Sequence, residues 1–327
     1  MKGGLTDVSG VRVGHATNPE ALTGCTVVLC ESGAVGGVEI RGWASGVIGL
    51  DLLDPRHLAE SIHAVCLSGG SAFGLEAVFG VKQFLEEKRI GFPVGRSVVP
   101  LVAGAILFDL SVGDGSVRPD KAMGYQACLS ATTGSVLEGS VGAGTGATVG
   151  KLRGISCAMK GGIGTASVNV GPIMVGALLA VNAFGDVVDP KTGRILAGAR
   201  TSPKGRIFLN TAETLRKGAR PPRFQHGANT TIGLIATNAK LTKAQATKVA
   251  GWAHLGLVRT ISPPHTTVDG DTLFCLSTGN LPADLDALGQ AAARVVASAA
   301  VRAIMAARGA GGVPARRDLA GLTRARE

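Results

Sequence analysis

The sequence is poor in aromatic side chains and in charge. Aromatic residues make up 4% of its 327 residues and charged residues 17%, whereas glycine occurs 49 times and apolar residues reach 45%. Few aromatics leave few surfaces on which nucleic-acid bases could stack. Low charge combined with many apolar residues excludes extensive disorder. We therefore expect a folded chain with a core of Ala, Val and Leu and with tight turns at glycines.

Cysteine spacings typical of zinc or redox sites are also missing. No C-x-x-C motif occurs, and the cysteines lie scattered, mostly within apolar runs. This usage favours buried free thiols and a reducing, cytoplasmic location. Cys25 and Cys30 are separated by an odd interval in an expected strand, so they should face opposite sides of it. The full set is Cys25, Cys30, Cys66, Cys128, Cys157 and Cys275.

No hydrophobic run is long enough to cross a bilayer. The most apolar stretch, VGPIMVGALLAVNAFG, is interrupted by Pro172 and Asn182. The first residues, MKGGLTDVSGVRVGH, lack the apolar core of a signal peptide. We therefore expect a soluble, cytoplasmic protein without a membrane partner.

Acidic residues are fewer than basic ones, and the formal net charge is +10. A basic patch can attract nucleic acid, but no nucleic-acid-binding module is recognisable in this chain. We expect a solvated, flexible tail over residues 309–327 and no nucleic-acid partner. The arginines that crowd this end of the chain are Arg302, Arg308, Arg316, Arg317, Arg324 and Arg326.

Short apolar strands alternate with helices along the chain, which predicts a mixed α/β fold. Apolar residues at helical spacing, Phe73 among them, predict a helix over residues 71–88. A second helix should begin at Thr242, which forms a capping box with Gln245. A third, Ala-rich helix is expected over residues 284–308. Strands are expected at 11–17, 25–30, 176–188, 206–210, 230–238 and 272–279.

The glycine-rich stretch GAGTGATVGK matches neither common nucleotide-binding motif. Gly142, Gly144 and Ala147 fit G-x-G-x-x-A, but the acidic residue required about 20 positions further on is absent. A P-loop requires a hydroxyl residue after its lysine, where Leu152 stands, and its first glycine is misplaced here. We expect no cofactor.

Two further catalytic patterns are incomplete. Ser71 follows an expected strand, as a nucleophile elbow would, but the G-x-S-x-G spacing fails because Phe73 occupies the last position. Asp54, His57 and His63 could gather around a metal ion. The segment that carries them, DLLDPRHLAESIHAV, is predicted more simply as a turn followed by a helix, so we expect no metal site.

A polar triplet precedes the expected buried strand in FQHGANTTIGLIATN. The basic, proline-containing segment 200–228 predicts an exposed linker that delivers the chain to Asn229. If the bond between Asn229 and Thr230 is cut, Thr230 carries both a nucleophilic hydroxyl and an α-amine that can serve as its base. Because the unperturbed pKa of an α-amine is about 8, no histidine is required. Before the cut, the same hydroxyl can attack the preceding carbonyl and form an ester that then hydrolyses.

Ordered blocks along the chain carry a family resemblance. They are GLTDVSGVRVGH, AVCLSGGSAFGLEAVFGVKQFLEE, VPLVAGAILFDL, GAGTGATVGK, KGGIGTAS, VNAFGDVVDP, NTTIGLIATN and DGDTLFCLSTGN. Together they resemble the DmpA-like family of L-aminopeptidase D-amidase/D-esterases, which includes the β-peptidyl aminopeptidases. The resemblance extends over nearly the whole chain to about Gly279.

The resemblance implies a proenzyme that cuts itself before a Ser or Thr. On that pattern, residues 1–229 become an α chain and residues 230–327 a β chain, and the two stay together as one structural domain. Thr230 is the implied nucleophile and Asn229 the last residue of the α chain. Thr231 is the rival hydroxyl, expected to point the other way along the strand.

The same resemblance implies three further groups of site residues. Asn182 matches the family's oxyanion-hole asparagine, whose amide would donate to a developing oxyanion. Asp271 matches a carboxylate that supports the nucleophile, and Asp269 stands where some relatives carry a serine. Two carboxylates so close together would raise the pKa of one of them or gather cations. The residues implied to bind substrate are Gly144, Thr145 and Gly146.

Fold, activity and assembly are implied as well. The implied fold is a four-layer α-β-β-α sandwich, and relatives assemble as tetramers of αβ units. The implied activity is aminopeptidase or amidase action on short peptides, amino-acid amides or esters. The alternatives are an amidase for one metabolite, as in a similar pantetheine hydrolase, an ornithine acetyltransferase-like acyl transfer, and an unprocessed binding or scaffold protein.

Overall fold

The main sheet turns over on itself along one long strand. The structure, a computed structural model, describes residues 3–219, 229–319 and 323–324. In sheet order its strands are β10 (Gly162–Val170), β11 (Ile173–Val181), β15 (Ile232–Ala239), β17 (Thr272–Leu281), β2 (Thr23–Ile40), β4 (Ile62–Ser68), β7 (Val102–Ile106) and β3 (Val47–Ile48), with β1 (Arg12–Asn18) paired to β2. The first part of β2 pairs with β1 and β4, and its last part pairs with β17. The long strand β2 therefore joins two halves of one sheet.

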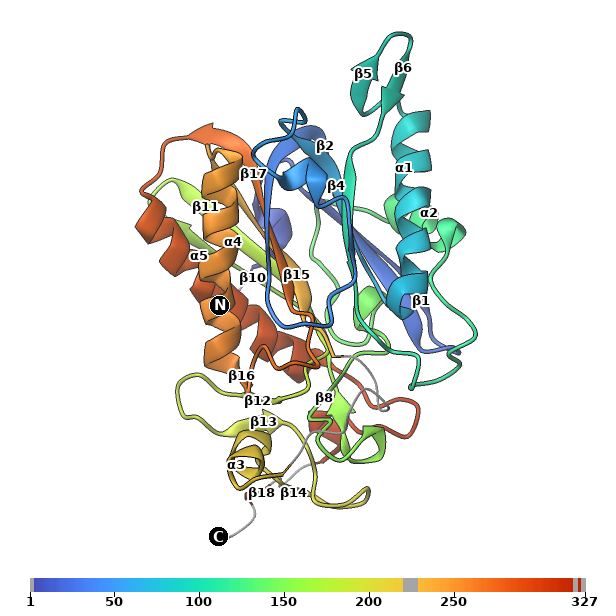
Figure 1. The fold of residues 1–327 in the computed structure, drawn as a ribbon, viewed down its shortest axis with the longest axis vertical. Helices are drawn as coiled ribbons and strands as arrows, with labels where there is room; N and C mark the ends of the chain where they lie inside the picture. The colour runs from blue at the N-terminus through green and yellow to red at the C-terminus, as the bar shows by residue number, and fades with distance from the viewer. Residues whose placement is uncertain (1–2, 220–228, 320–322, 325–327) are drawn as a thin grey trace.

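Helices cover both outer faces of this folded sheet (Figure 1). α4 (Lys243–Thr260) and α5 (Leu285–Ala306) lie over the half that contains β10, β11, β15 and β17. α1 (Ala77–Glu87) and α2 (Lys121–Leu129) lie over the half that contains β1, β4 and β7. Three hydrophobic clusters fill the spaces between helices and sheet on each side and between the two halves. The predicted four-layer α-β-β-α sandwich is confirmed.

Successive side chains of the central strands alternate between two cores, as pleated strands require. Leu178 packs between the two halves of the sheet, whereas its neighbour Leu179 packs in the cluster beneath α4 and α5. Cys25 lies in the core beside α1 and α2, and Cys30 lies in the core between the halves, so the prediction of opposite faces is confirmed. All six cysteines are buried and free, as predicted. Burial on both faces explains why so few of the strand residues are charged.

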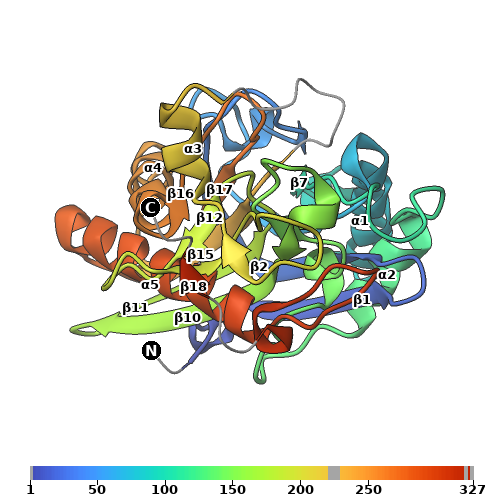
Figure 2. The same ribbon diagram turned by 90° about the horizontal axis from the view of Figure 1, so that it is seen from below.

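Shorter elements complete the fold, several of them beyond the ends of the main sheet (Figures 1 and 2). The strands among them are β5 (Phe92–Val94), β6 (Ser97–Val99), β8 (Thr148–Val149), β9 (Met159–Lys160), β12 (Asp186–Val188), β13 (Ile195–Ala197), β14 (Ile207–Phe208), β16 (Ile261–Ser262) and β18 (Thr323–Arg324). The remaining helices are α3 (Thr211–Arg216) and the 3-10 segments Leu5–Asp7, Asp51–Leu53, Ser71–Glu76, Gly142–Gly144, Ile155–Cys157 and Arg316–Asp318. β12 pairs with β13 and β16, and this small sheet lies below the main sheet in Figure 1.

The helices predicted over residues 71–88, from Thr242 and over 284–308 form, with one difference in the first. Residues 71–76 of the helix predicted over 71–88 are a 3-10 segment, and Phe73 is 57% exposed rather than buried. Its ring instead lies 3.8 Å from the guanidinium carbon of Arg118. The capping box at Thr242 is present at the start of α4, and α5 begins after Asp284, as predicted.

Two sequence-based element predictions are wrong. The helix expected after the turn that begins at Asp51 is instead the strand β4, which lies between β2 and β7 and is buried along its whole length. A strand buried on both faces has a continuous apolar run, which its periodicity does not distinguish from a buried helix. The single strand expected over residues 176–188 breaks after Val181. Asn182 leaves the ladder there, and its side chain accepts a hydrogen bond from the backbone of Thr148, the first residue of β8.

The predicted linker 200–228 is partly folded. Arg200 is buried, and its guanidinium donates to the carbonyl oxygen of Ser156 at 2.8 Å. Thr211 is also buried at the start of α3. Residues 220–228 of the predicted linker lie outside the described residues.

Residues 309–319, which we expected to belong to a flexible tail, are instead packed against the fold. Val313 and Ala315 are buried, and the carbonyl oxygen of Pro314 accepts a hydrogen bond from the backbone of Lys160 at 2.9 Å. Small apolar residues such as Val313 and Ala315 supply this packing. The prediction failed because it considered only the overall Gly-, Pro- and Arg-rich composition.

α5 is long and apolar enough to cross a membrane by length and composition, but most of it is buried within the fold. Arginines near the C-terminus make local contacts around it. Arg317 donates to the last carbonyls of the helix, at Met305 and Ala306, and Arg302 pairs with Glu138 at 2.6 Å. Cations near a helix C-terminus are favoured by its dipole.

Candidate active site

Strand ends from both sides of the predicted cut meet at one edge of the main sheet. β15 and β17 run parallel, so their first residues, Ile232 and Thr272, are paired. β11 and β2 run antiparallel to these strands and end at the same edge. The residues just outside these strands, which include Thr230, Asn182 and Asp271, are therefore brought together.

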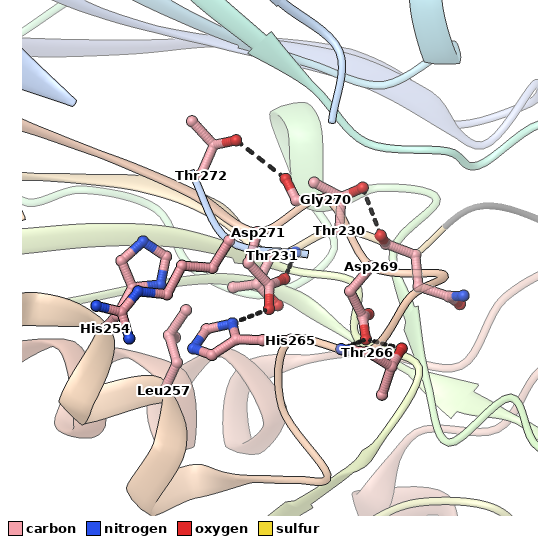
Figure 3. A network of polar contacts seen from close by, with 12 residues as sticks. Thr230, Thr231, His254, Leu257, His265, Thr266, Asp269, Gly270, Asp271 and Thr272 are labelled. Atoms are coloured by element: carbon pink, nitrogen blue, oxygen red, sulfur yellow. Dashed lines mark hydrogen bonds and ion pairs between the residues drawn. The ribbon is translucent and has the colours of Figure 1, made fainter. Parts of the chain in front are cut away.

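Thr230 lies against the peptide bond that the sequence singles out. Its Oγ1 donates to the carbonyl oxygen of Asn229 at 2.6 Å (Figure 3). The backbone N–H of Gly270 donates to the same oxygen at 2.8 Å, and the N–H of Thr230 donates to the main-chain oxygen of Asn182 at 3.1 Å. The side chain of Thr230 is buried. A hydroxyl and a backbone donor thus converge on one carbonyl group.

Thr231 has a different environment. Its N–H donates to Oδ1 of Asp271 at 2.7 Å. Its hydroxyl is buried and has no hydrogen-bond partner in the part of the chain that the structure describes. Of the two neighbouring hydroxyls, Thr230 is therefore the one placed on the peptide carbonyl.

The amide of Asn182 is fixed by hydrogen bonds to both its oxygen and its nitrogen. Oδ1 accepts from the backbone of Thr148 at 2.9 Å and from Nζ of Lys151 at 2.8 Å. Nδ2 donates to the carbonyl oxygen of Phe108 at 3.1 Å. Donors face Oδ1 and an acceptor faces Nδ2, so the orientation of the amide is determined. Asn182 contacts Thr230 through its main-chain oxygen rather than through this amide.

Lys151 is a buried cation that the sequence analysis missed. Its Nζ donates to both the main-chain and the side-chain oxygen of Asn182, at 2.9 and 2.8 Å. Burial lowers the pKa of this lysine to about 7. The only signal in the sequence is a lysine that ends a glycine-rich block without completing a P-loop.

Asp269 and Asp271 hold different parts of the site (Figure 3). Oδ1 of Asp269 accepts from the backbone of Phe184 at 3.0 Å, and Oδ2 accepts from the backbone and hydroxyl of Thr266. Asp271 accepts from Thr231 and lies 2.7 Å from Nδ1 of His265. Burial, and then the nearby charge of Asp271, raise the pKa of Asp269 to about 6.

Gly270 must be glycine for this geometry. A Cβ at this position would lie 2.3 Å from the carbonyl oxygen of Ala44, in the loop that follows β2. That loop is tied to the site because the N–H groups of Trp43 and Ala44 donate to the main-chain oxygen of Asp269. The absence of a side chain lets this loop approach while Gly270 N–H donates to Asn229.

The block Gly144–Gly146, predicted to bind substrate, is buried behind this edge. Nζ of Lys160 donates to the carbonyl oxygen of Thr145 at 2.6 Å. The carboxylate of Asp109 lies next to Gly146, where a Cβ would come within 2.7 Å of it. Burial lowers the pKa of Lys160 to about 8 and raises the pKa of Asp109. The contact of this block with substrate stays a prediction.

Asp54, His57 and His63 do not come together as a metal site. Asp54 pairs with Arg56 at 2.5 Å, and His57 is exposed. Nδ1 of His63 accepts from the backbone of Leu101 at 3.3 Å. Within residues 3–219, 229–319 and 323–324, no three or more metal-ligating side chains are grouped.

An α-β-β-α sandwich with candidate site residues at these strand ends defines the class, a hydrolase of the N-terminal-nucleophile fold. The chain matches the model of Peptidase family S58 over residues 4–317, and it belongs to that family. It is thus an aminopeptidase-type hydrolase. The alternative of a binding or scaffold protein without enzymatic activity is therefore wrong.

Curated relatives agree with this assignment. An uncharacterized aminopeptidase of Mycobacterium tuberculosis is 41% identical over 96% of this chain and 97% of its own length. A 6-aminohexanoate-oligomer endohydrolase of Kocuria sp. is 33% identical over 91% of this chain and 84% of its own length.

Solved structures also agree. A beta-aminopeptidase of Burkholderia sp. aligns with a TM-score of 0.68 and 26% identity, covering 97% of this chain and 92% of the other. An L-aminopeptidase D-Ala-esterase/amidase of Ochrobactrum anthropi aligns with a TM-score of 0.73 over 96% of this chain and 89% of the other. At 21% identity, the second match supports the fold alone. The predicted family resemblance is confirmed.

Proposed function

We propose that this protein is a self-processing N-terminal-threonine hydrolase that removes residues from short peptides, amino-acid amides or esters. One observation carries the proposal. The hydroxyl of Thr230 lies 2.6 Å from the carbonyl oxygen of Asn229, which also accepts the N–H of Gly270. These contacts support the proposed roles of Thr230 as nucleophile, of the Asn229 carbonyl as the group attacked and of Gly270 N–H as an oxyanion donor.

The proposed self-cleavage uses these contacts. Oγ1 of Thr230 attacks the carbonyl carbon of Asn229, and the negative charge that develops on the carbonyl oxygen is stabilised by Gly270 N–H. The C–N bond then breaks, and the hydroxyl proton ends on the departing nitrogen of Thr230. Water hydrolyses the resulting ester, which leaves a carboxylate on Asn229 and restores the hydroxyl of Thr230.

Turnover uses the same groups after the cut. The new α-amine of Thr230 accepts the hydroxyl proton, so it must be neutral. In the uncut chain, the peptide N–H of Thr230 donates to the same oxygen of Asn182 as Nζ of Lys151 does. A positive charge on Lys151 would therefore lower the pKa of the amine formed there. The substrate carbonyl takes the position of Asn229, with Gly270 N–H as one donor.

Asn182 supplies a second oxyanion donor in this proposal, in agreement with the family pattern. Its Nδ2 carries two N–H donors; one donates to the carbonyl oxygen of Phe108, and the second would donate to the oxyanion. Asp271 and Asp269 act as supports in this proposal: Asp271 holds the N–H of Thr231, the residue after the nucleophile, and Asp269 holds the N–H of Phe184, two residues after Asn182.

Short amides are the substrate class that the relatives support. A 6-aminohexanoate-oligomer endohydrolase and a beta-aminopeptidase are both among the similar proteins. A homotetramer of αβ units and a cytoplasmic location remain part of this proposal.

Three variants test the proposal in parallel. Thr230→Ala should give a folded, uncut and inactive chain, because the attacking oxygen of both steps is lost. Thr230→Ser should still cut and retain some activity, with slower rates because the freed χ1 torsion positions the hydroxyl less well. Thr231→Ala should cut and turn over. Cleavage is read by denaturing gel, and activity by release of amine from a small aminoacyl amide; cutting and normal hydrolysis by Thr230→Ala would sink the proposal.

A further inference from the structure

His265 contacts Asp271, which in turn contacts Thr231, the residue after the candidate nucleophile. Its backbone conformation is unusual. It follows β16 in the segment Ser262–His265, and its φ is +51°, which is uncommon for a residue with a side chain. Residues held in such regions persist where the surrounding structure determines them, and they cluster at functional sites. The backbone here is set so that the ring faces Asp271 (Figure 3).

The contact between His265 and Asp271 is short and shielded from solvent. Nδ1 lies 2.7 Å from Oδ2, and the two side chains are 15% and 1% exposed. Because a carboxylate can only accept, Nδ1 carries the proton in this bond. Nε2 of His265 is buried and has no hydrogen-bond partner among the described residues, so the ring acts through Nδ1 alone.

The ring of His265 is supported from its other side by α4. His254 packs edge-on against it, with ring centroids 5.0 Å apart. Nε2 of His254 donates to the carbonyl oxygen of Glu39 at 3.1 Å, so this second ring is anchored to β2. Burial lowers the pKa of His254 to about 4, which keeps it neutral. His265 is therefore held between a rigid neutral ring and a carboxylate.

Asp271 links this histidine to the nucleophile. Its Oδ2 accepts a hydrogen bond from His265 Nδ1–H, and its Oδ1 accepts one from the N–H of Thr231, each at 2.7 Å. Thr231 is the residue directly after Thr230, so a rotation of the Asp271 carboxylate would move the peptide that carries the nucleophile. Asp271 itself has no other hydrogen-bonded side chain in the described ranges.

We propose that His265 is a positioning residue for both reactions of Thr230. Its Nδ1–H locks the carboxylate of Asp271, and the locked carboxylate fixes Thr231 N–H and holds the Thr230 hydroxyl on the carbonyl to be attacked. This inference rests on the proposed N-terminal-threonine mechanism. The group that matters is one N–H donor at the position of Nδ1, not the charge or bulk of the imidazole.

Three substitutions at this position separate donor, bulk and backbone strain. His265→Asn keeps an N–H at the distance of Nδ1, and Asn tolerates a positive φ. His265→Gln moves its amide to the distance of Nε2, where it cannot serve Asp271. His265→Gly removes the donor and also relieves the backbone, so its effect cannot be attributed to strain.

The experiment measures kcat and KM for amine release from a small aminoacyl amide and the time course of cutting after cell-free synthesis. A lost hydrogen bond to a charged group predicts a fall in kcat of roughly 10- to 100-fold for His265→Gln and His265→Gly, with KM nearly unchanged. Cutting should slow in parallel. His265→Asn should stay within about 3-fold of the parent protein, since one charge-assisted bond is retained. Thermal melting checks that each variant is folded.

Two outcomes overturn the inference. Parent-like kcat and cutting in His265→Gly show that no donor is needed, and equal losses in folded His265→Asn and His265→Gln show that the Nδ1 position is not the cause. Thr230→Ala, run alongside, keeps the two proposals distinguishable. If Thr230→Ala still cuts, the proposed function itself fails; if it does not cut while His265→Gly behaves as the parent, only the role of His265 fails.

Discussion

At the scale of single residues, the buried Lys151 is linked to the candidate nucleophile Thr230 through Asn182. Lys151 donates to both oxygens of Asn182, and Asn182 in turn accepts the backbone N–H of Thr230. A buried amine without a carboxylate in direct contact is costly, and here burial lowers its pKa to about 7. Because both of its hydrogen bonds go to Asn182, we infer that Lys151 orients Asn182.

Replacing this lysine tests that role. Lys151→Met should keep the fold, because an unbranched side chain of similar length fills the space. It should lower kcat by roughly 10-fold or more, since Asn182 loses the cation that holds both its oxygens. Lys243→Met is the matched control: Lys243 is also buried, but its Nζ contacts Asp54 and His57, away from this edge, so kcat should hold. Equal kcat in both variants would contradict the assignment.

The carboxyl of Asp269 predicts how self-cleavage depends on pH. Burial and the charge of Asp271 raise its pKa to about 6, so Asp269 is protonated below that pH and ionised above it. The ionised form accepts from Phe184 and from both donors of Thr266 more strongly than the neutral acid does. The rate of self-cleavage should therefore rise as pH increases through about 6.

Single-turnover cutting is the suitable readout, because the α-amine that also titrates does not exist before the cut. Asp269→Asn should cut slowly and lose the inflection near pH 6. An inflection that survives in Asp269→Asn would assign it to another group.

At the scale of elements, short sequence patterns were enough to predict the helices α4 and α5. The capping box at Thr242 predicts the start of α4, and the Ala-rich run after Asp284 predicts α5, because both patterns lie within the helix that they specify. The edge that assembles the site depends instead on pairing between β15 and β17, and between β11 and β15, which are distant in sequence. Family resemblance could supply Thr230, Asn182 and the two aspartates, but no local pattern could supply the contact between His265 and Asp271.

Asp186 ties the small lower sheet to the helix α3. Its buried carboxylate accepts from Ala199 N–H at 2.8 Å and from the N–H and hydroxyl of Thr211 at 2.6 and 2.8 Å. The helix α3 is thereby anchored at its first residue. Burial outweighs these bonds and raises the pKa of Asp186 to about 6.

This shift predicts a pH-dependent stability difference. A carboxyl whose folded pKa exceeds its unfolded value stabilises the fold below the unfolded value, and that contribution is lost as pH rises through the folded pKa. The parent protein should therefore lose stability relative to Asp186→Asn between about pH 4 and pH 6, by on the order of 2–3 kcal/mol. Denaturant unfolding of both proteins across this range measures the difference. A gap that moves in favour of the parent as pH rises would contradict the shift.

At the scale of the whole molecule, the two pieces expected from self-cleavage share one sheet. β15 and β17 belong to the piece after Asn229, and they lie between β11 and β2, which belong to the piece before it. The clusters beneath α4 and α5 and between the sheet halves contain residues of both pieces. Separation would break two strand ladders and open two cores.

We therefore expect the pieces to stay together after the cut. A denaturing gel should show two bands, whereas gel filtration in native buffer should show one peak that contains both. They should part only in denaturant, together with loss of the folded far-UV signal. Two separately folded species in native buffer would contradict the shared sheet.

The central claim is that Thr230 becomes an N-terminal nucleophile, and the most direct measurement is the position of the new terminus. Intact mass and N-terminal sequencing of the purified protein should find a second chain that begins with Thr230 and a first chain that ends with Asn229. Thr230→Ala should yield a single uncut mass from the same preparation. A protein that stays in one piece after prolonged incubation, or whose second chain begins at Thr231 or elsewhere, would contradict the account.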